Sequence, residues 1–350
     1  MSAPEFAIAG RPIGPDHPPY IVAELSANHL GGIDRAMALI DAAKEAGADA
    51  VKLQTYTADT ITIDHDGPEF RIQGGLWDGR TLYDLYREAH TPWDWHGPLF
   101  AHGRDIGIAI FSSPFDFTAI DLLESLDAPA YKIASFECID LPLIRAAAAT
   151  GKPLVMSTGM ADLDEIEAAV TTARAAGAAG LVLLHCVSEY PASPDVYNLR
   201  TIADLGSRFD AIPGLSDHTL GSATAIAAVA QGACLIEKHL TMARADGGPD
   251  AAFSAEPEEF AELVAGCRTA WAALGRVSYE RGAAERGNRQ FRRSLYAVAD
   301  IAAGAMLTPE NVRSIRPGNG LPPADYDRVL GRRARGAITR GTPLAWDLID

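Results

Sequence analysis

The chain has 350 residues, 48% of them hydrophobic and 22% charged, which is ordinary for a globular protein. Its formal net charge of -16 argues against nucleic acid or an anionic membrane as partner, because both repel an acidic surface. No apolar run reaches membrane-spanning length, and the amino terminus lacks a basic start followed by an apolar core. The four cysteines lack CxxC spacing, so we expect buried thiols and a cytoplasmic protein.

Eight short apolar runs each lead into polar, reactive side chains. In chain order these segments are Ile21 to Asn28, Ala50 to Gln54, Ile108 to Ser113, Ala130 to Glu137, Leu154 to Thr158, Leu181 to Tyr190, Ile212 to His218 and Cys234 to His239. Apolar residues spaced three and four apart predict helices between them, at 33–46, 162–176, 197–209, 221–231 and 256–274. Alternating buried strands and helices predict a parallel sheet covered by helices.

The polar ends of all eight runs favour a (β/α)8 TIM barrel. In such a barrel every strand end meets at one rim, and the chemistry gathers there. An open doubly wound sheet is the alternative, but it concentrates its chemistry at one switch point. A barrel takes about 250 residues, and we expect it to occupy residues 1–277.

The barrel pattern fades after about residue 276. Residues 278–290 are polar and rich in glycine and arginine, which is typical of a linker. Residues 291–350 then form a small, β-rich module, with a helix start expected at Thr308 to Asn311 and a final strand containing Trp346. Such a small unit buries little core alone and gains from docking on another surface.

Several motifs are distributed over the whole chain. They are ELSANH at 24–29, DAVKLQTY at 49–56, YKIAS at 131–135, STGM at 157–160, GLSDHT at 214–219, EKH at 237–239, GGPD at 247–250 and RPGNG at 316–320. Together they resemble the sialic acid synthase family, in which a barrel that condenses phosphoenolpyruvate (PEP) precedes an antifreeze-like (SAF) domain. Within this family, the subgroup of pseudaminic acid synthases is the most similar. The similarity lies in residues 76–96, in FSSPFD at 111–116 and in the segment after GGPD.

The resemblance implies a reaction. The enol carbon of PEP bonds to the aldehyde of an open-chain aminosugar, water attacks the former enol carbon, and phosphate leaves by C–O cleavage. The subgroup implies 2,4-diacetamido-2,4,6-trideoxy-L-altrose as the sugar and pseudaminic acid as the product. The alternative sugar is N-acetylmannosamine, which gives N-acetylneuraminate, or a 2,4-diacetamido-trideoxy-mannose, which gives legionaminic acid. A non-catalytic glycan- or ice-binding protein is disfavoured because the histidines and lysines of the rim are all present.

His218 and His239 resemble the family's two metal ligands and follow neighbouring predicted strands. A cation is expected to polarise the aldehyde. Two protein ligands leave positions for water and substrate oxygens, which suits Mn²⁺, Mg²⁺ or Co²⁺ better than a closed structural zinc site. Two histidines that are merely satisfied within the barrel mouth are the alternative.

PEP needs cations and hydrogen-bond donors for its two acidic groups. By resemblance, the phosphate contacts are Ser113, Lys132, Ser135 and Ser188, and the carboxylate contacts are Lys52, Ser157 and Ser216. Lys238 is expected on the same rim as Lys52 and Lys132, where three lysines favour an anion site. Each serine alone could instead cap a helix, although helix N-termini also bind anions. Ser188 stands where the family commonly has an amide side chain.

Glu24 resembles a family carboxylate close to the reacting carbons, and we hypothesise that it handles the aldehyde proton or orients the attacking water. A salt bridge to Lys52 is its alternative role. The sugar contacts implied by the resemblance are Gln54, Glu137, Tyr190, Asp250 and Arg316. In the family the arginine reaches the barrel mouth of the other subunit, which implies a domain-swapped homodimer. A solvated loop charge is the alternative for Arg316.

Residues 57–80 form a long connection after the second predicted strand. Loops of this length are often functional, so the connection is expected to line part of the sugar pocket. Trp77, Trp93 and Trp95 are expected to pack it against the barrel flank.

Overall fold

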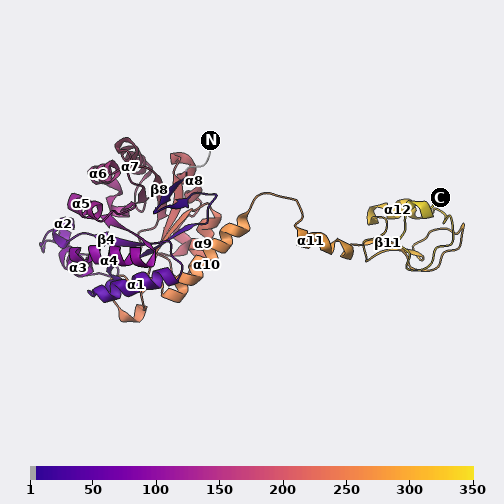
Figure 1. The fold of residues 1–350 in the computed structure, drawn as a ribbon, viewed down its shortest axis with the longest axis horizontal. Helices are drawn as coiled ribbons and strands as arrows, with labels where there is room; N and C mark the ends of the chain where they lie inside the picture. Colours follow the sequence, from indigo (N-terminus) through magenta and orange to yellow (C-terminus); the bar gives the residue numbers. More distant parts are fainter. Residues whose placement is uncertain (1–4) are drawn as a thin grey trace. The chain divides into compact units, whose positions relative to one another are not determined.

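The computed structural model describes residues 5–350, and its larger part is a closed barrel of parallel strands (Figure 1). The strand order around the barrel is β10-β3-β4-β5-β6-β7-β8-β9. The strands are β3 (Tyr20–Glu24), β4 (Ala50–Thr55), β5 (Ala109–Pro114), β6 (Tyr131–Ile133), β7 (Leu154–Ser157), β8 (Leu181–Cys186), β9 (Ile212–Asp217) and β10 (Leu235–His239). Each coincides with one apolar run, so the TIM barrel is confirmed and the open sheet is excluded.

Helices surround the barrel (Figure 1). They are α1 (Ile33–Glu45), α4 (Trp93–Ile106), α5 (Phe117–Ser125), α6 (Leu141–Ala149), α7 (Leu163–Ala176), α8 (Thr201–Phe209), α9 (Ala223–Ala230) and α10 (Pro257–Leu274). The helix expected from residue 197 begins only at Thr201, because residues Pro194–Val196 form a separate 3-10 turn. Gly177 ends α7 with φ 98°, a left-handed conformation that glycine adopts without steric cost.

Side chains along each strand alternate between the barrel interior and the layer under the helices. Near the strand starts the interior residues are apolar and include Val22, Phe111 and Val155. Further along, the inward positions become polar, and register pairs Glu24 with both Lys52 and His239. The barrel therefore has an apolar plug at one end and a charged mouth at the other.

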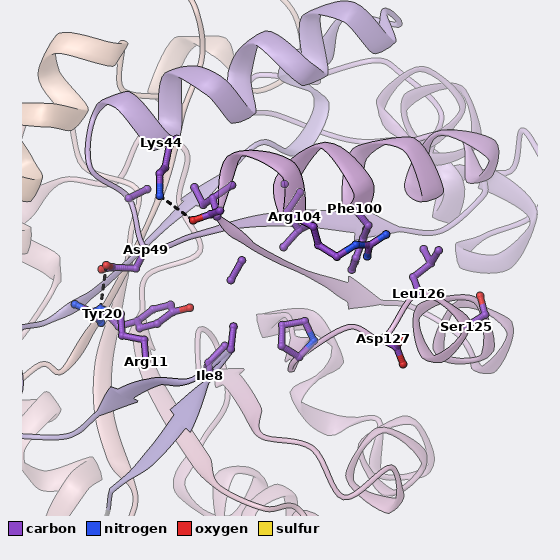
Figure 2. Close-up of a pocket in the computed structure, with 18 residues that line it drawn as sticks. Ile8, Arg11, Tyr20, Lys44, Asp49, Phe100, Arg104, Ser125, Leu126 and Asp127 are labelled. Atoms are coloured by element: carbon purple, nitrogen blue, oxygen red, sulfur yellow. Dashed lines mark hydrogen bonds and ion pairs between the residues drawn. The ribbon is translucent and has the colours of Figure 1, made fainter.

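The hairpin of β1 (Phe6–Ile8) and β2 (Arg11–Ile13) packs Ile8 and Ile13 against the apolar plug. Beside it lies a hollow of about 670 Å³ at the amino-terminal ends of the strands (Figure 2). Two of its basic groups already have partners. Arg11 Nε lies 3.0 Å from Asp49 Oδ1, and Lys44 Nζ donates to the Gly107 carbonyl at 2.7 Å. No expected site residue lines this hollow, so the chemistry belongs to the opposite end.

The connection between β4 and β5 is longer than a simple strand-to-helix loop. It contains α2 (Ala58–Ile61), the 3-10 turn Pro68–Phe70 and α3 (Leu82–Ala89) before reaching α4. The Trp77 indole Nε1 donates to the Pro249 carbonyl at 3.0 Å, which ties the connection to the loop after β10. Trp77 lines a pocket there, so the expectation that it packs on the barrel flank is wrong.

The chain divides into two compact units, one running to Gly275 and the other from Arg276 to Asp350. In the second unit β11 (Ser294–Ala297) pairs antiparallel with β12 (Val312–Ile315). A small core forms around them, and it includes Leu295, Ile301, Leu307, Val312, Val329, Ile338, Leu344 and Ile349. The short helix α11 (Ala283–Gly287) lies within the segment expected to be a linker.

Two local predictions in the second unit are wrong. Residues Thr308 to Asn311 form a turn rather than a helix start, because the Thr308 amide donates to the Asn311 side-chain oxygen at 2.8 Å and the chain continues into β12. Trp346 lies in a 3-10 turn, Trp346–Leu348, rather than in a final strand. At Thr308 to Asn311 a polar side chain that bonds nearby backbone overrides the short-range helix pattern.

All four cysteines are buried and free. Cys138 and Cys267 pack under the helices and Cys234 within the barrel plug, whereas Cys186 faces the charged mouth. Within residues 5–350, no helix combines the length and the apolar character needed to cross a membrane.

Candidate active site

A pocket of about 480 Å³ opens at the carboxyl ends of the barrel strands. Most of the residues predicted from the sequence to form the site line it. They are Lys52, Gln54, Lys132, Ser135, Glu137, Ser157, Tyr190, Ser216, His218, His239 and Asp250. Barrel closure thus brings side chains from the whole length of the first unit to one place.

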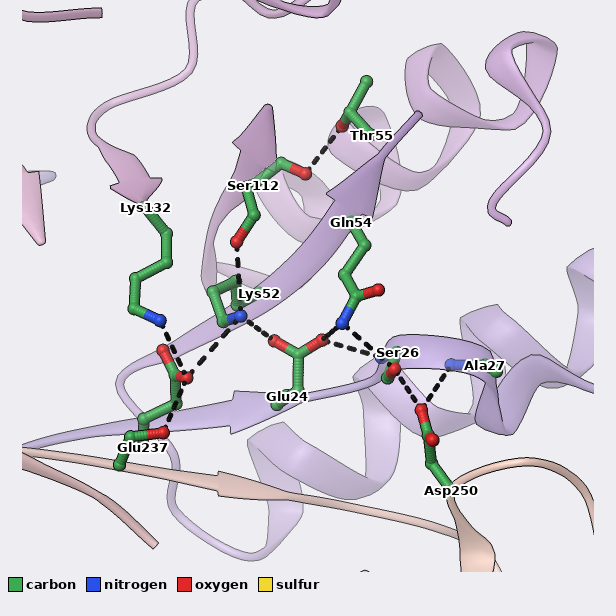
Figure 3. A network of polar contacts seen from close by, with 12 residues as sticks. Glu24, Ser26, Ala27, Lys52, Gln54, Thr55, Ser112, Lys132, Glu237 and Asp250 are labelled. Carbon is green, nitrogen blue, oxygen red and sulfur yellow. Dashed lines mark hydrogen bonds and ion pairs between the residues drawn. The ribbon is translucent and has the colours of Figure 1, made fainter. Parts of the chain in front are cut away.

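Two lysines and two glutamates form the floor of the mouth (Figure 3). Lys52 Nζ lies 2.5 Å from a Glu24 oxygen and 3.5 Å from Glu237, and Lys132 Nζ lies 3.3 Å from Glu237. All four side chains are buried, and this balanced pairing offsets part of their desolvation. Burial raises the pKa of Glu24. Burial also opposes ionisation of Glu237, but Lys132 and Lys52 outweigh it and lower the pKa of Glu237.

Glu24 lies behind the pocket lining rather than on it. One of its oxygens accepts hydrogen bonds from the Ser26 amide at 3.0 Å and from Gln54 Nε2 at 3.2 Å (Figure 3). The other oxygen faces Lys52. The salt bridge to Lys52 is therefore present, and the proposed work on a proton stays a prediction.

Lys238 does not belong to the mouth, and its expected place there is wrong. Its Nζ lies 2.8 Å from Asp217 Oδ2 and donates to the Thr219 carbonyl at 2.5 Å, outside the pocket lining. Strand alternation explains this, because Glu237 and His239 point inward and the residue between them must point outward. Sequence analysis missed Glu237, although the same period of two in EKH could have found it.

The two candidate metal ligands lie side by side, with ring centroids 5.5 Å apart. His218 Nδ1 bonds the Val187 carbonyl at 2.8 Å, which leaves Nε2 as its possible ligand atom. His239 Nδ1 is buried and has no hydrogen-bond partner in the described part of the chain. Burial, and then the neighbouring His218, holds the pKa of His239 well below its ordinary value, so this imidazole is neutral as a ligand must be.

This donor set fits a labile divalent cation. Two imidazoles on adjacent strands present nitrogen atoms, and the remaining positions would fall to water or substrate oxygens. Across residues 5–350 no group of three or more His, Cys, Asp or Glu side chains is arranged to hold a metal ion. A closed structural zinc site is therefore not built in this part of the chain.

Several buried polar atoms around the pocket lack a hydrogen-bond partner among the described residues. They include Glu137 Oε2, Ser157 Oγ, Ser188 Oγ, Glu237 Oε2 and His239 Nδ1. Buried polar atoms in proteins are nearly always partnered. Their concentration here indicates a place for a ligand rich in polar groups.

Two predicted phosphate contacts converge on Gly159, in the loop after β7. A Cβ atom at Gly159 would lie 2.7 Å from Ser135 Oγ and still closer to Ser188 Oγ. Only a residue without a side chain leaves this space open. Ser113 differs, because it is fully buried below the pocket and accepts a hydrogen bond from Lys52 Nζ at 3.3 Å. Its place favours a role in holding Lys52 over the direct phosphate contact expected.

The sugar contacts expected from the barrel form a second polar cluster. Asp250 accepts hydrogen bonds from Ser26 Oγ and from the Ala27 amide, and Gln54 Nε2 donates to the same Ser26 Oγ at 3.1 Å (Figure 3). Burial raises the pKa of Asp250, and burial raises the pKa of Glu137 to about 7. Asp250 is therefore part of a network and does more than close a turn.

Tyr190 and Phe253 pack against the histidine pair. The Tyr190 ring centroid lies 4.4 Å from that of His218, and Phe253 lies 4.9 Å from His239. Arg316 belongs to the second unit, where it is exposed on the segment after β12. Its predicted contact with the sugar stays a prediction.

Apart from Ser26 and Glu237, the rest of the pocket lining is largely apolar, and sequence analysis missed most of it. These residues include Tyr56, Ile61, Ile72, Trp77, Leu82, Leu85, Tyr86, Ala89, Phe115, Phe136 and Phe253. Apolar residues are ordinarily assigned to the core, so no motif identified them. The length of the connection was the only signal. Ile61, Ile72 and Trp77 of residues 57–80 do line this pocket, and their contact with the sugar stays a prediction.

Family models match both units: NeuB family over residues 39–279 and SAF domain over residues 292–350. The chain belongs to the NeuB family. The fold and the resemblance read from the motifs are thereby confirmed. A relative from Helicobacter pylori, named pseudaminic acid synthase, is 43% identical over 334 residues, which are 95% of this chain and 98% of the relative.

More distant NeuB-type proteins also cover most of the chain. A Legionella pneumophila protein named N,N'-diacetyllegionaminic acid synthase is 36% identical over 97% of each chain. A crystal structure of N-acetylneuraminic acid synthetase from Leptospira borgpetersenii superposes with a TM-score of 0.73 at 32% identity, covering 82% of this chain and 95% of the other.

Proposed function

We propose that this NeuB-family chain is a pseudaminic acid synthase. It joins C3 of PEP to the aldehyde carbon of 2,4-diacetamido-2,4,6-trideoxy-L-altrose, adds the oxygen of water at C2 of PEP, and releases phosphate by cleaving its bond to that carbon. One observation carries the proposal: the polar mouth that gathers Lys52, Lys132 and the histidine pair lies in a chain 43% identical, over nearly its full length, to a relative bearing that name.

PEP binds at the charged floor in this proposal. Lys132 and Ser135, with Ser188 beside Gly159, hold the phosphate, and Lys52 with Ser157 and Ser216 holds the carboxylate. Glu237 lies within 3.5 Å of both ammonium groups, and its negative charge favours their charged forms. The buried hydroxyl oxygens of Ser157 and Ser188 have no hydrogen-bond partner within residues 5–350, and bound PEP would supply one.

His218 and His239 would hold a divalent cation, Mn²⁺, Mg²⁺ or Co²⁺. When bound there, such an ion supplies Lewis-acid polarisation of the aldehyde oxygen. The protein's part is to orient both rings, through the Val187 carbonyl that His218 contacts and through packing by Tyr190 and Phe253.

Glu24 is the residue to which we assign the proton transfer in this reaction. Burial raises the pKa of Glu24, which favours its taking up a proton, and its contacts with Ser26 and Gln54 fix the orientation of the carboxyl group. We propose that it gives a proton to the former aldehyde oxygen or orients the attacking water.

The second unit is proposed to act on the barrel of a second copy, in a domain-swapped homodimer that brings Arg316 to the sugar. The distribution of charged residues between the two units supports this arrangement. From Arg276 onward there are thirteen arginines and eight acidic residues, whereas the whole chain carries -16. A basic second unit and an acidic first unit attract each other. We place the enzyme in the cytoplasm, where its four free cysteines stay reduced.

Phosphate release from PEP tests the function directly. The assay uses the full chain with the diacetamido-altrose, N-acetylmannosamine or the legionaminic acid precursor, with and without added Mn²⁺ after chelation. We expect release with the first sugar and its loss without metal. Turnover only with another of the three sugars would assign that product instead. A folded protein inactive on all three would favour the non-catalytic alternative.

A further inference from the structure

The pocket has two chemically different ends. At its floor are the ammonium, carboxylate and imidazole groups of strands β4, β6 and β10. At its outer side is a surface of apolar side chains, nearly all from the connection between β4 and β5. We call this surface the apolar wall and define it as Tyr56, Ile72, Leu85, Tyr86 and Phe115.

The wall is preformed. Tyr56 lies edge-on to Tyr86, with centroids 5.7 Å apart, and edge-on to Phe115 at 5.1 Å. Leu85 is only 7% exposed, next to Tyr86 on α3. Such perpendicular ring contacts are favourable arrangements and hold the aromatic side chains in place.

The position of the wall relative to the polar sugar contacts is also set. Trp77 donates to the Pro249 carbonyl at 3.0 Å, in the residue before Asp250, and its ring lies 5.7 Å from Tyr190. Tyr56 and Tyr86 line the same pocket as Gln54, Glu137 and Asp250, the predicted sugar contacts. Burial raises the pKa of both phenols.

The direction of the bound sugar follows from the two ends. The aldehyde must lie near the histidine pair and PEP, so the rest of the open-chain sugar extends away from the charged floor. Its far end then meets the apolar wall. A free hydroxyl there would lose water without gaining a partner at Leu85 or Phe115, whereas a methyl group would gain contacts.

We propose that the apolar wall determines the sugar specificity, by selecting an open-chain sugar whose far end carries methyl groups in place of free hydroxyls. This inference rests on the proposed function and names the residues that set its substrate class. The rings of Tyr56 and Phe115 take up the apolar substituents, and the phenol group of Tyr86 donates to an acetamido carbonyl.

The test compares two sugars that differ in one atom: 2,4-diacetamido-2,4,6-trideoxy-L-altrose and its 6-hydroxy analogue. The ratio of their kcat/KM values is measured for the full chain, for Leu85→Asn and for Ile72→Asn. We expect each variant to lower the preference for the methyl sugar about tenfold or more, because an amide can pair with the hydroxyl. The change should fall on the KM of the sugar and leave the KM of PEP unchanged.

Ile63→Asn is the matched control. Ile63 lies on the same connection, is 57% exposed and does not line the pocket, so its ratio should equal that of the parent. Melting temperatures identify a variant that misfolds. Ile72, which is only partly buried, carries the test if the Leu85 variant does not fold.

Tyr86→Phe and Tyr86→Ala separate the ring from its hydroxyl. If both variants lose the preference for the methyl sugar, the phenol group acts as a hydrogen-bond donor to the sugar. If only the alanine variant loses this preference, the ring itself makes the contact. An unchanged ratio of kcat/KM values in the folded Leu85 and Ile72 variants would contradict the proposal that the apolar wall determines the sugar specificity. A parent enzyme that turns over neither diacetamido sugar would overturn the proposed function instead.

Discussion

Each charge on the floor of the pocket has an opposite charge within 3.5 Å. Lys52 contacts Glu24 and Glu237, and Lys132 contacts Glu237. Removing one member of such a buried set leaves an uncompensated charge, which costs about 3–5 kcal/mol. An amide replacement keeps the shape of a glutamate but removes its charge, so the folding of each variant is measured together with its kinetics.

Glu24→Gln should lower kcat by about 10² to 10⁴ and change the affinity for PEP and Mn²⁺ far less. The amide keeps the shape but cannot exchange a proton, and Lys52 retains Glu237 as its partner. Steady-state kinetics at several PEP and Mn²⁺ concentrations measure this. Glu124→Gln is the control, since Glu124 pairs with Lys152 outside the pocket. Unchanged turnover would retire the proton assignment.

Glu137→Gln tests the raised pKa of Glu137, about 7 in the folded chain against an ordinary 4.5. The folded state keeps a proton that the unfolded state has already released, so wild-type stability falls as pH rises from 4.5 through 7. The variant lacks this loss, which is at most about 3 kcal/mol. Its melting temperature should exceed that of wild type more at pH 8 than at pH 5.5. For the exposed control Glu262→Gln we expect the same difference in melting temperature at both pH values. The same result for Glu137→Gln would refute the prediction that Glu137 is a neutral carboxyl group in the folded chain.

At the scale of elements, the loops that follow the barrel strands shape the site. The loop after β7 leaves space at Gly159 for the Ser135 and Ser188 hydroxyls, and the connection after β4 supplies the apolar wall. The strands determine which residues point inward, and the loops determine what fits between them.

Gly159→Ala should raise the KM for PEP about tenfold or more, because the added methyl group occupies the space shared by Ser135 and Ser188. Inhibition by inorganic phosphate should weaken in parallel. Gly97→Ala in α4 is the control, since nothing lies within 4 Å of its added Cβ. A stable Gly159→Ala enzyme with unchanged KM would place the phosphate elsewhere.

At the scale of the whole molecule, the first unit carries the chemistry and the second unit carries the basic charge. The second unit has its own small core and a predicted contact residue, Arg316. An incomplete site that needs a second copy makes activity depend on assembly.

Mixing two inactive full-length variants tests that dependence. Glu24→Gln retains Arg316, and Arg316→Ala retains Glu24. If the second unit acts on the other copy, mixed dimers contain one complete site, and random re-pairing restores about one quarter of wild-type activity. Activity that stays at the level of the separate variants would show that the unit does not act across the dimer.

The sequence by itself determined the barrel and most of its mouth. Polar side chains that follow eight apolar runs are a local property of the sequence, and barrel closure necessarily brings the ends of those runs together. For that reason Lys52, Lys132, His218 and His239 could be assigned to one pocket. The alternation of side chains along a strand, had it been applied to EKH, would have exchanged Lys238 for Glu237.

Only the tertiary structure decided the apolar wall, the cradle at Gly159 and the place of Ser113 below Lys52. An apolar residue such as Leu85 has the same sequence signature in a core as in a binding pocket, because both exclude water. What distinguishes them is whether another part of the chain fills the space beside them. That depends on how the connection after β4 meets the Pro249 loop, a contact between residues 172 positions apart.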